Sequence, residues 1–250
     1  MAKAPNPIIL IPARLASTRL PDKPLAEIHG ETMIVHCWRR AVEADIGRVV
    51  VASADAAIAD AVLAAGGEAV LTDPAHPSGS DRIHEGVQLA DPNGRHDIVI
   101  NMQGDSPNLA PIALHATLDL LSNPNVDIGT VAAEIVDEDE RDDPSAVKAV
   151  VAWEKDENHG RALYFTRATA PSGDGPLYHH IGLYAYRRTA LERFVALPRS
   201  PLEIREGLEQ LRAMEAGMRI DVACVDTVPL TVDTPADLAR ARSLMQPQDK

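Results

Sequence analysis

The chain has 250 residues, a hydrophobic content of 45% and a formal net charge of −13. This length suffices for the core of an α/β domain, and the negative field disfavours a nucleic-acid binder because it repels phosphates. No stretch approaches the roughly 20 apolar residues of a membrane span. The N-terminal apolar run is short and is interrupted by Pro12, so we expect no signal peptide and a cytoplasmic protein.

Short β-branched runs alternate with helical patterns in the first half. The patterns predict strands over 7–12, 48–53, 68–72 and 97–102, and helices over 32–45, 55–67, 81–90 and 111–121. Alternation at this spacing indicates βαβ units and a mostly parallel sheet flanked by helices. On helix 32–45 we place Ile34, Trp38, Ala41 and Val42 on one apolar face.

The second half is less regular. It predicts strands over 146–153, 180–186 and 219–225, and helices over 202–217 and 234–245. Ser200 and Glu203 indicate a capping box at the start of the first helix, and Thr234 is expected to cap the second. No linker divides the chain. We therefore expect one α/β domain over residues 1–250, with a smaller sheet in the second half.

Three cations lie in the loop after the first predicted strand: Arg14, Arg19 and Lys23. Guanidinium groups suit phosphate oxygens, and lysine adds a point charge. Pro21 and Pro24 stiffen this loop. The loop has neither a dinucleotide fingerprint nor a P-loop. A phosphate-binding loop and a solvated surface loop both explain the pattern.

The segment "HPSGSDR" (76–82) follows the third predicted strand. Its small residues allow close backbone approach, and Ser80 or Asp81 is expected to cap the next helix. Arg82, with these backbone groups, suits a base edge or a phosphate. An ordinary helix cap and turn explains the same residues.

The segment "NMQGDSP" (101–107) ends the fourth predicted strand and places Asp105 at the carboxyl end of the sheet. Ligands of open α/β sheets bind at this edge, and one or two carboxylates plus substrate phosphates commonly hold Mg²⁺. Asp233, just before the cap residue Thr234, is a second candidate ligand. The alternatives are an Asp turn at Asp105 and a helix-dipole charge at Asp233.

Eight segments occur in order over nearly the whole chain: "PARLASTRLPDKPL", "HPSGSDR", "NMQGDSP", "SAVKAV", "ALYFTRA", "HHIGLYAYR", "SPLEIREGLEQLR" and "VDTPADL". Together they resemble the 3-deoxy-manno-octulosonate cytidylyltransferases, also called CMP-Kdo synthetases. The resemblance implies a Rossmann-like nucleotidyltransferase that converts CTP and Kdo into CMP-Kdo and pyrophosphate for lipopolysaccharide biosynthesis. No nucleophile–base constellation stands out in the sequence, which agrees with a reaction that depends on positioning and charge neutralisation.

The resemblance also implies residue roles. The triphosphate would be held by Arg14 and Lys23, with Arg19 nearby. The remaining nucleotide contacts would be Ala13, Ser78, Gly79, Arg82 and Gln103. Mg²⁺ would be bound by Asp105 and Asp233, which with Arg14 and Lys23 form the expected catalytic set. The sugar would be contacted by Gln103, Arg167, His180, Tyr184, Glu209 and Gln210.

The resemblance further implies a homodimer, with residues 165–215 as a sugar-binding and dimerisation region. Ser106 departs from the family's Gln-Gly-Asp-Glu-Pro loop, because it replaces the Glu. Three alternatives stay open: a cytidylyltransferase for 8-amino-Kdo or a sialic acid, an enzyme that uses UTP or GTP, and a non-catalytic nucleotide-binding protein on the same fold.

Overall fold

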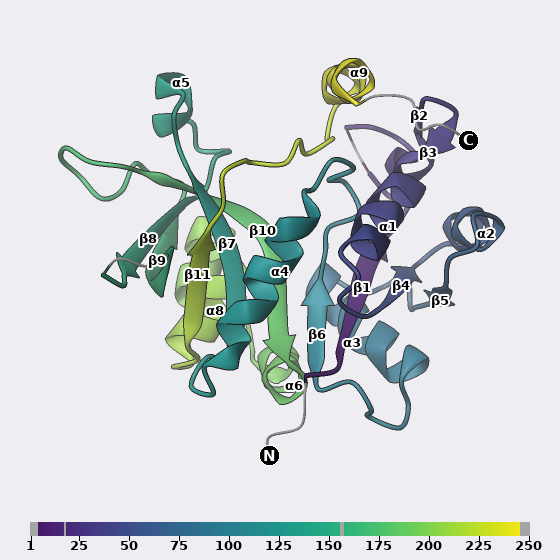
Figure 1. Ribbon diagram of the computed structural model, residues 1–250, viewed down its shortest axis with the longest axis horizontal. Coiled ribbons are helices and arrows are strands. Elements are labelled where there is room, and N and C mark those ends of the chain that lie inside the picture. The colour runs from purple at the N-terminus through teal and green to yellow at the C-terminus, as the bar shows by residue number, and fades with distance from the viewer. Residues whose placement is uncertain (1–4, 18, 156–157, 246–250) are drawn as a thin grey trace. The chain divides into compact units, whose positions relative to one another are not determined.

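The computed structural model describes residues 5–17, 19–155 and 158–245 (Figure 1). The chain divides into two compact units. The first comprises residues up to Leu114 together with those from Pro229 onward, and the second is His115–Val228. The expectation of a single domain over residues 1–250 stays a prediction. Among the described residues, no helix is both long and apolar enough to cross a membrane.

The first unit contains four parallel strands. Their order is β5 (Ala69–Leu71), β4 (Arg48–Ser53), β1 (Pro7–Ala13) and β6 (Ile98–Asn101). The residues from Ile8 to Ile11 in β1 are fully buried. Strands covered on both faces read as continuous apolar runs, which is why this pattern predicted them. The expected α/β class with a parallel sheet is confirmed.

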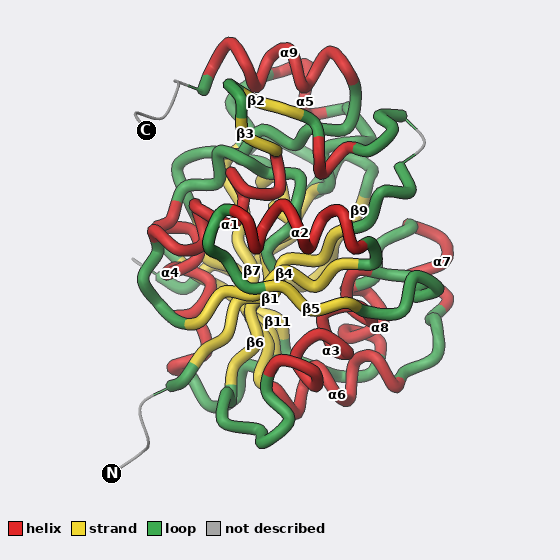
Figure 2. The backbone as a smooth tube through the Cα atoms, turned by 90° about the vertical axis from the view of Figure 1, so that its right-hand side faces the viewer, coloured by secondary structure: helices red, strands yellow, loops and turns green. Residues whose placement is uncertain are grey.

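Helices cover both faces of this sheet. The helices α1 (Met33–Glu43) and α2 (Ala56–Ala64) connect strands that step from β1 outward to β5, whereas α3 (Gly79–Ala90) returns the chain to β6. Right-handed crossovers then place α1 and α2 on one face and α3 on the other, as Figure 2 shows. The strand order reverses between β1 and β6, which is where open α/β sheets bind ligands.

Gly86 sets how closely α3 approaches the sheet. A Cβ added at Gly86 would lie 2.8 Å from the Cβ of Ala52 and 3.3 Å from Leu10 Cδ1. Any larger residue would therefore push α3 away from β1 and β4. This close packing fixes the position of the helix whose first residues reach the pocket described below.

Short elements complete the first unit. They are the 3₁₀ turn η1 (Lys23–Leu25), the hairpin strands β2 (Glu27–Ile28) and β3 (Glu31–Thr32), and the helix α9 (Pro235–Leu244). The helix α4 (Pro111–Asp119) leads from the first unit into the second.

The second unit contains a mixed sheet. Its strand order is β10 (Tyr178–Arg187), β7 (Ile128–Glu134), β11 (Ile220–Cys224), β9 (His159–Thr166) and β8 (Lys148–Trp153). Only β7 and β11 pair in parallel, and the other neighbours are antiparallel. The helical elements are η2 (Leu120–Ser122), α5 (Glu138–Arg141), α6 (Arg188–Ala196), α7 (Pro201–Glu206) and α8 (Gln210–Glu215). A second-half sheet is present as expected, with five described strands, but β7, β9 and α6 were not predicted.

Two local predictions were wrong. The single helix expected over 202–217 is two helices, because Gly207 adopts a left-handed conformation with φ of 67° and ends α7. The capping box at Ser200 and Glu203 is present as predicted. Val42 does not share the buried face of α1, since it is 46% exposed.

Candidate active site

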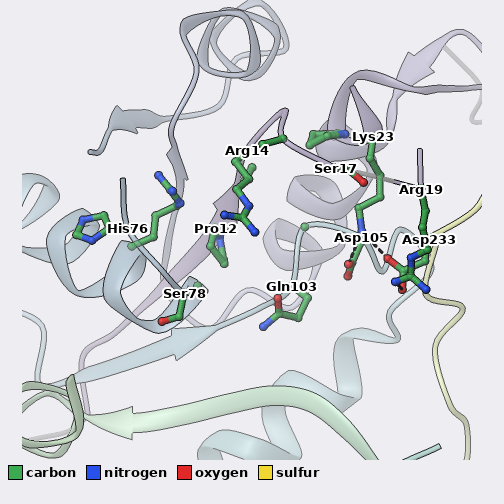
Figure 3. A pocket seen from close by; sticks show the side chains of 16 residues that line it. Pro12, Arg14, Ser17, Arg19, Lys23, His76, Ser78, Gln103, Asp105 and Asp233 are labelled. Atoms are coloured by element: carbon green, nitrogen blue, oxygen red, sulfur yellow. Dashed lines mark hydrogen bonds and ion pairs between the residues drawn. The ribbon is translucent and has the colours of Figure 1, made fainter. Parts of the chain in front are cut away.

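A pocket of about 410 Å³ lies in the first unit, beside the carboxyl ends of β1 and β6. This volume is typical of small-molecule sites. Residues from the loops after β1, before α3 and after β6 line it (Figure 3). The pocket brings together all ten residues predicted for the nucleotide and the metal: Ala13, Arg14, Arg19, Lys23, Ser78, Gly79, Arg82, Gln103, Asp105 and Asp233.

The ammonium of Lys23 lies between two carboxylates. Its Nζ donates to Asp105 Oδ2 at 2.8 Å and to Asp233 Oδ1 at 2.9 Å. Arg19 Nη2 donates to the other oxygen of Asp233 at 2.9 Å. Burial alone would lower the pKa of Lys23, but the charges and hydrogen bonds of Asp105 and Asp233 outweigh burial and raise that pKa. Lys23 therefore stays charged. The cations predicted to bind phosphate are thus hydrogen-bonded to the carboxylates predicted to bind the metal.

The two carboxylates come from segments that the backbone holds together. The amide of Val232 donates to the carbonyl oxygen of Asp105 at 2.9 Å. Thr234 begins α9 in a capping box with Asp237, as expected from Thr234 as cap. Because Thr234 and Asp237 satisfy the helix end, the Asp233 carboxylate is available for Lys23 and Arg19.

Arg82 lines the pocket and is buried. Its Nη1 donates to Thr72 Oγ1 at 2.6 Å and to the carbonyl oxygen of Asp73 at 3.2 Å, while its Nη2 is buried and has no hydrogen-bond partner among the described residues. Burial first, and the charge of Arg14 second, lower the pKa of Arg82. An unpaired buried donor is costly, so an acceptor on a bound ligand would remove this cost. The pair of arginines fits an anionic ligand.

Ser78, rather than Ser80 or Asp81, caps α3. The Ser78 hydroxyl accepts from the Asp81 amide at 3.2 Å and donates to the Asp81 carboxylate at 2.6 Å. The predicted cap was therefore wrong by two or three residues. Ser78 and Gly79 line the pocket, so the positive end of the α3 dipole adds to its attraction for anions.

Three of the predicted sugar contacts lie near one another in the second unit, and a fourth, Gln210, directly follows Glu209 in the chain. The rings of His180 and Tyr184 have centroids 5.5 Å apart, and the charge of Glu209 contributes to the raised pKa of Tyr184, after burial and Tyr186. Gln210 is buried, and its Nε2 has no hydrogen-bond partner among the described residues. The group thus includes one buried donor, on Gln210, that has no partner among the described residues.

The other two predicted sugar contacts lie elsewhere. Arg167 follows β9, and its side chain donates to the carbonyl oxygens of Glu206 and Pro144, both at 2.9 Å. Gln103 lines the pocket of the first unit.

Comparison with known proteins identifies the family. Residues 8–220 match the family model described as cytidylyltransferase. The chain is 67% identical to a 3-deoxy-manno-octulosonate cytidylyltransferase of Rhodospirillum centenum, over 99% of this chain and 97% of the relative. The chain belongs to the 3-deoxy-manno-octulosonate cytidylyltransferase family. A relative of the same description from Paramagnetospirillum magneticum is 61% identical over 96% of this chain and 98% of its own length.

Solved structures agree with this membership of the cytidylyltransferase family. The structure of a CMP:2-keto-3-deoxy-manno-octonic acid synthetase complexed with CTP matches with a TM-score of 0.87 at 38% identity, covering 96% of this chain and 98% of that one. A 4-diphosphocytidyl-2C-methyl-D-erythritol synthase from Anaerococcus prevotii matches with a TM-score of 0.65 at 13% identity, covering 96% and 98% of the two chains. The second match shows a shared fold alone.

Several pocket residues of this family member were not predicted from the sequence. They are Pro12, Ala16, Ser17, Pro24, His76 and Gly104. His76 is fixed by Glu85, whose Oε2 lies 2.6 Å from the His76 Nε2 and also accepts from the Asp73 amide at 2.8 Å. His76 begins the same "HPSGSDR" segment that pointed to Arg82, so proximity in sequence was the available signal.

Ser106, the position where the resemblance led us to expect a Glu, is buried beside the site. Ser106 is 7% exposed, and its carbonyl oxygen accepts a hydrogen bond from the Leu109 amide at 3.2 Å. At this position the chain therefore has a small hydroxyl within the turn that follows Asp105.

Because His180 is buried, we expect the free energy of unfolding to depend on pH. Burial, and secondarily the charge of His179, lower the pKa of His180 to about 3. Between pH 6.5 and pH 3 the unfolded chain therefore binds a proton at this residue that the folded chain does not, so stability is lost as pH falls through this window. At pH 5 the loss is about 2 kcal/mol relative to pH 7.

Urea unfolding of the wild type and of His180→Gln at pH 7 and pH 5 measures this contribution. The loss of stability from pH 7 to pH 5 is expected to be smaller in the variant by about 2 kcal/mol, because glutamine does not titrate. An equal loss in the two proteins would contradict the assignment of this pH dependence to His180.

Proposed function

We propose that this chain transfers CMP from CTP to 3-deoxy-D-manno-octulosonate, releases pyrophosphate and supplies CMP-Kdo for lipopolysaccharide biosynthesis. The observation that carries this proposal is the pocket of the first unit, where Lys23 contacts both Asp105 and Asp233 in a member of the cytidylyltransferase family. A 38%-identical relative has been solved in complex with CTP, which supports the choice of nucleotide.

The proposed reaction needs no enzyme nucleophile. The anomeric hydroxyl of the sugar attacks the α-phosphorus of CTP, a new P–O bond forms, the bond to pyrophosphate breaks, and the hydroxyl proton is released to water. Such a transfer is accelerated by positioning and by cations around the phosphates. We assign Arg14 and Lys23 to the triphosphate, with Arg19 beside them, and we assign the unpaired Nη2 of Arg82 to an acceptor on the cytidine.

Mg²⁺ fits the carboxylates of this site. Asp105 and Asp233 converge on one ammonium, at 2.8 and 2.9 Å, so both already direct oxygens toward a cation. Two carboxylates completed by substrate phosphates are a common Mg²⁺ arrangement. We propose that these two residues hold the ion. When bound, Mg²⁺ supplies charge neutralisation for the phosphate oxygens.

The carboxylated sugar would be recognised mainly by the second unit. We assign its carboxylate to Arg167 and its hydroxyls to the group formed by His180, Tyr184, Glu209 and Gln210. Gln103 is proposed to contact both substrates. The Arg167 side chain is held in place by hydrogen bonds to the carbonyl oxygens of Glu206 and Pro144. These bonds support its role, because an oriented guanidinium loses less entropy on binding a carboxylate. A homodimer and a cytoplasmic location, where CTP is made, belong to the same proposal.

Pyrophosphate release over a panel of substrates tests the proposal. With Mg²⁺ present, CTP is paired with Kdo, 8-amino-Kdo and a sialic acid, and Kdo is paired with CTP, UTP and GTP. We expect kcat/KM to be highest for CTP with Kdo. Turnover of another acidic sugar but not Kdo would overturn the sugar assignment. Turnover of Kdo with UTP or GTP but not CTP would overturn the nucleotide assignment, and no turnover of any pair would favour a non-catalytic protein.

A further inference from the structure

One carboxylate in the second unit joins two of the segments assigned to the sugar. Glu206 is the last residue of α7. Its Oε1 accepts from the hydroxyls of Tyr164 at 3.2 Å and Thr166 at 3.1 Å, and its Oε2 accepts from the amide of Arg167 at 3.1 Å. All these donors lie in β9 or directly after it. The end of β9 is thereby attached to the end of α7.

The attachment is reciprocal. Arg167 Nε donates to the carbonyl oxygen of Glu206 at 2.9 Å, so the Arg167 side chain satisfies one of the orphan carbonyls at the C-terminus of α7. Arg167 Nη1 donates to the carbonyl oxygen of Pro144 at 2.9 Å. These two bonds use two of the five guanidinium donors and both go to neutral oxygens. Arg167 is exposed, so its charge can still meet an anion.

The position of Glu206 in the chain gives this contact a second consequence. The next residue, Gly207, adopts the left-handed conformation that ends α7, and the turn leads directly to Glu209 and Gln210. A carboxylate that fixes the end of α7 against β9 therefore fixes the spacing between Arg167 and the Glu209–Gln210 segment.

We propose that Glu206 is a positioning residue for recognition of the carboxylated sugar, acting through Arg167. This inference rests on the proposed function, since it takes Arg167 as the partner of the sugar carboxylate. The chemistry requires an acceptor: three of the contacts on Glu206 come from hydroxyl or amide donors. In Glu206→Gln the side-chain oxygen can still accept from the Arg167 amide, but the side-chain amide nitrogen then faces the two hydroxyls, which must accept instead of donate. The substitution therefore reverses these two bonds and removes the charge of the acceptor.

Glu215 provides a matched control. It is the last residue of α8, and its carboxylate accepts from the amide of Leu202 at 3.1 Å. Glu215→Gln thus removes a carboxylate that also joins a helix end to the backbone of another segment, but without contact to Arg167. If Glu206 only stabilises the packing of α7, as Glu215 does for α8, the two variants are expected to have similar KM values for Kdo.

The experiment compares steady-state kinetics of the full chain as wild type, Glu206→Gln, Glu215→Gln, Arg167→Ala and the double variant Arg167→Ala/Glu206→Gln. We expect Glu206→Gln to raise the KM for Kdo about tenfold, because bonds to a charged acceptor are lost. The KM for CTP is expected to stay within about twofold, since the proposed nucleotide pocket is not touched. Glu215→Gln is expected to match the wild type, and the double variant to match Arg167→Ala.

The outcomes separate the two proposals. If Arg167→Ala leaves the KM for Kdo unchanged, the sugar assignment in the proposed function fails and this inference fails with it. If Arg167→Ala raises that KM while Glu206→Gln does not, the inference alone is overturned. Equal increases in both KM values for Glu206→Gln would also overturn it, as would an additive double variant. Should Glu206→Gln not fold, Thr166→Val, which removes one donor to the same carboxylate, is expected to raise only the KM for Kdo.

Discussion

Replacing Asp105 by asparagine is expected to lower kcat at least about 100-fold while the fold persists. Loss of a group that only orients a metal ligand costs about 10–100-fold, so loss of a ligand itself should cost at least the upper value. Asparagine has nearly the shape of aspartate but carries no charge for Mg²⁺ or Lys23. Because Asp105 is proposed to hold the ion while Arg14 and Lys23 hold the triphosphate, CTP binding should be only partly weakened.

Pyrophosphate release, circular dichroism and CTP titration measure these three properties of Asp105→Asn. Asp22→Asn is the control, because Asp22 is exposed and directly precedes Lys23. Its backbone is left-handed, with φ of 53°, a conformation that asparagine adopts readily. The control is expected to keep the wild-type kcat. A wild-type kcat in Asp105→Asn would refute the role assigned to this carboxylate.

Replacing Lys23 by methionine is expected to raise the affinity for Mg²⁺ and to lower kcat/KM for CTP. In the described structure, the Lys23 ammonium occupies the space between the carboxylates proposed for the metal. Without it, Asp105 and Asp233 are left without their shared cation and should bind Mg²⁺ on the order of tenfold more tightly in the absence of nucleotide. The same substitution removes a proposed triphosphate contact, so kcat/KM for CTP should fall on the order of 100-fold.

Isothermal titration of Mg²⁺ into nucleotide-free protein measures the first effect, and steady-state kinetics measures the second. Arg19→Met is the graded control, because the Arg19 side chain is 67% exposed and contacts only Asp233 of the pair. Its effect on Mg²⁺ affinity should be smaller than that of Lys23→Met. An unchanged affinity in Lys23→Met would show that the ammonium and the ion do not compete for the carboxylates.

Buried strands and capped helices were the parts of the fold that sequence reasoning predicted well. The runs that became β1 and β4 are continuous and apolar because both faces are covered, and Ser200 and Thr234 each begin a helix with a capping box. The strand β7 was missed because its segment, "IGTVAAE", mixes alanines with Gly129, residues of low strand propensity. Gly129 is required there by packing, since a Cβ would lie 2.5 Å from the carbonyl oxygen of Thr117.

Sequence reasoning selected residues that the structure brings to one pocket, but it did not predict the contacts between them. Loops after the predicted strands pointed to Arg14, Lys23 and Asp105, because parallel strands bring such loops to one edge. Lys23 and Asp233 are separated by 210 residues. Local sequence predicts that a helix begins at Thr234, but the pairing depends on where this helix start lies in space, which tertiary packing decides. The helix break at Gly207 was missed for a related reason: a glycine within a helical pattern is tolerated or ends the helix according to its surroundings.

Phosphorus NMR of a mixture of CTP, Kdo, Mg²⁺ and the wild-type chain tests the central claim most directly. The account predicts that the triphosphate signals of CTP disappear while a phosphodiester signal of CMP-Kdo and a pyrophosphate signal appear in equal amounts, and that the same mixture with Asp105→Asn changes at least about 100-fold more slowly. CTP that stays intact with the wild-type chain, or pyrophosphate that forms without the phosphodiester, would contradict it.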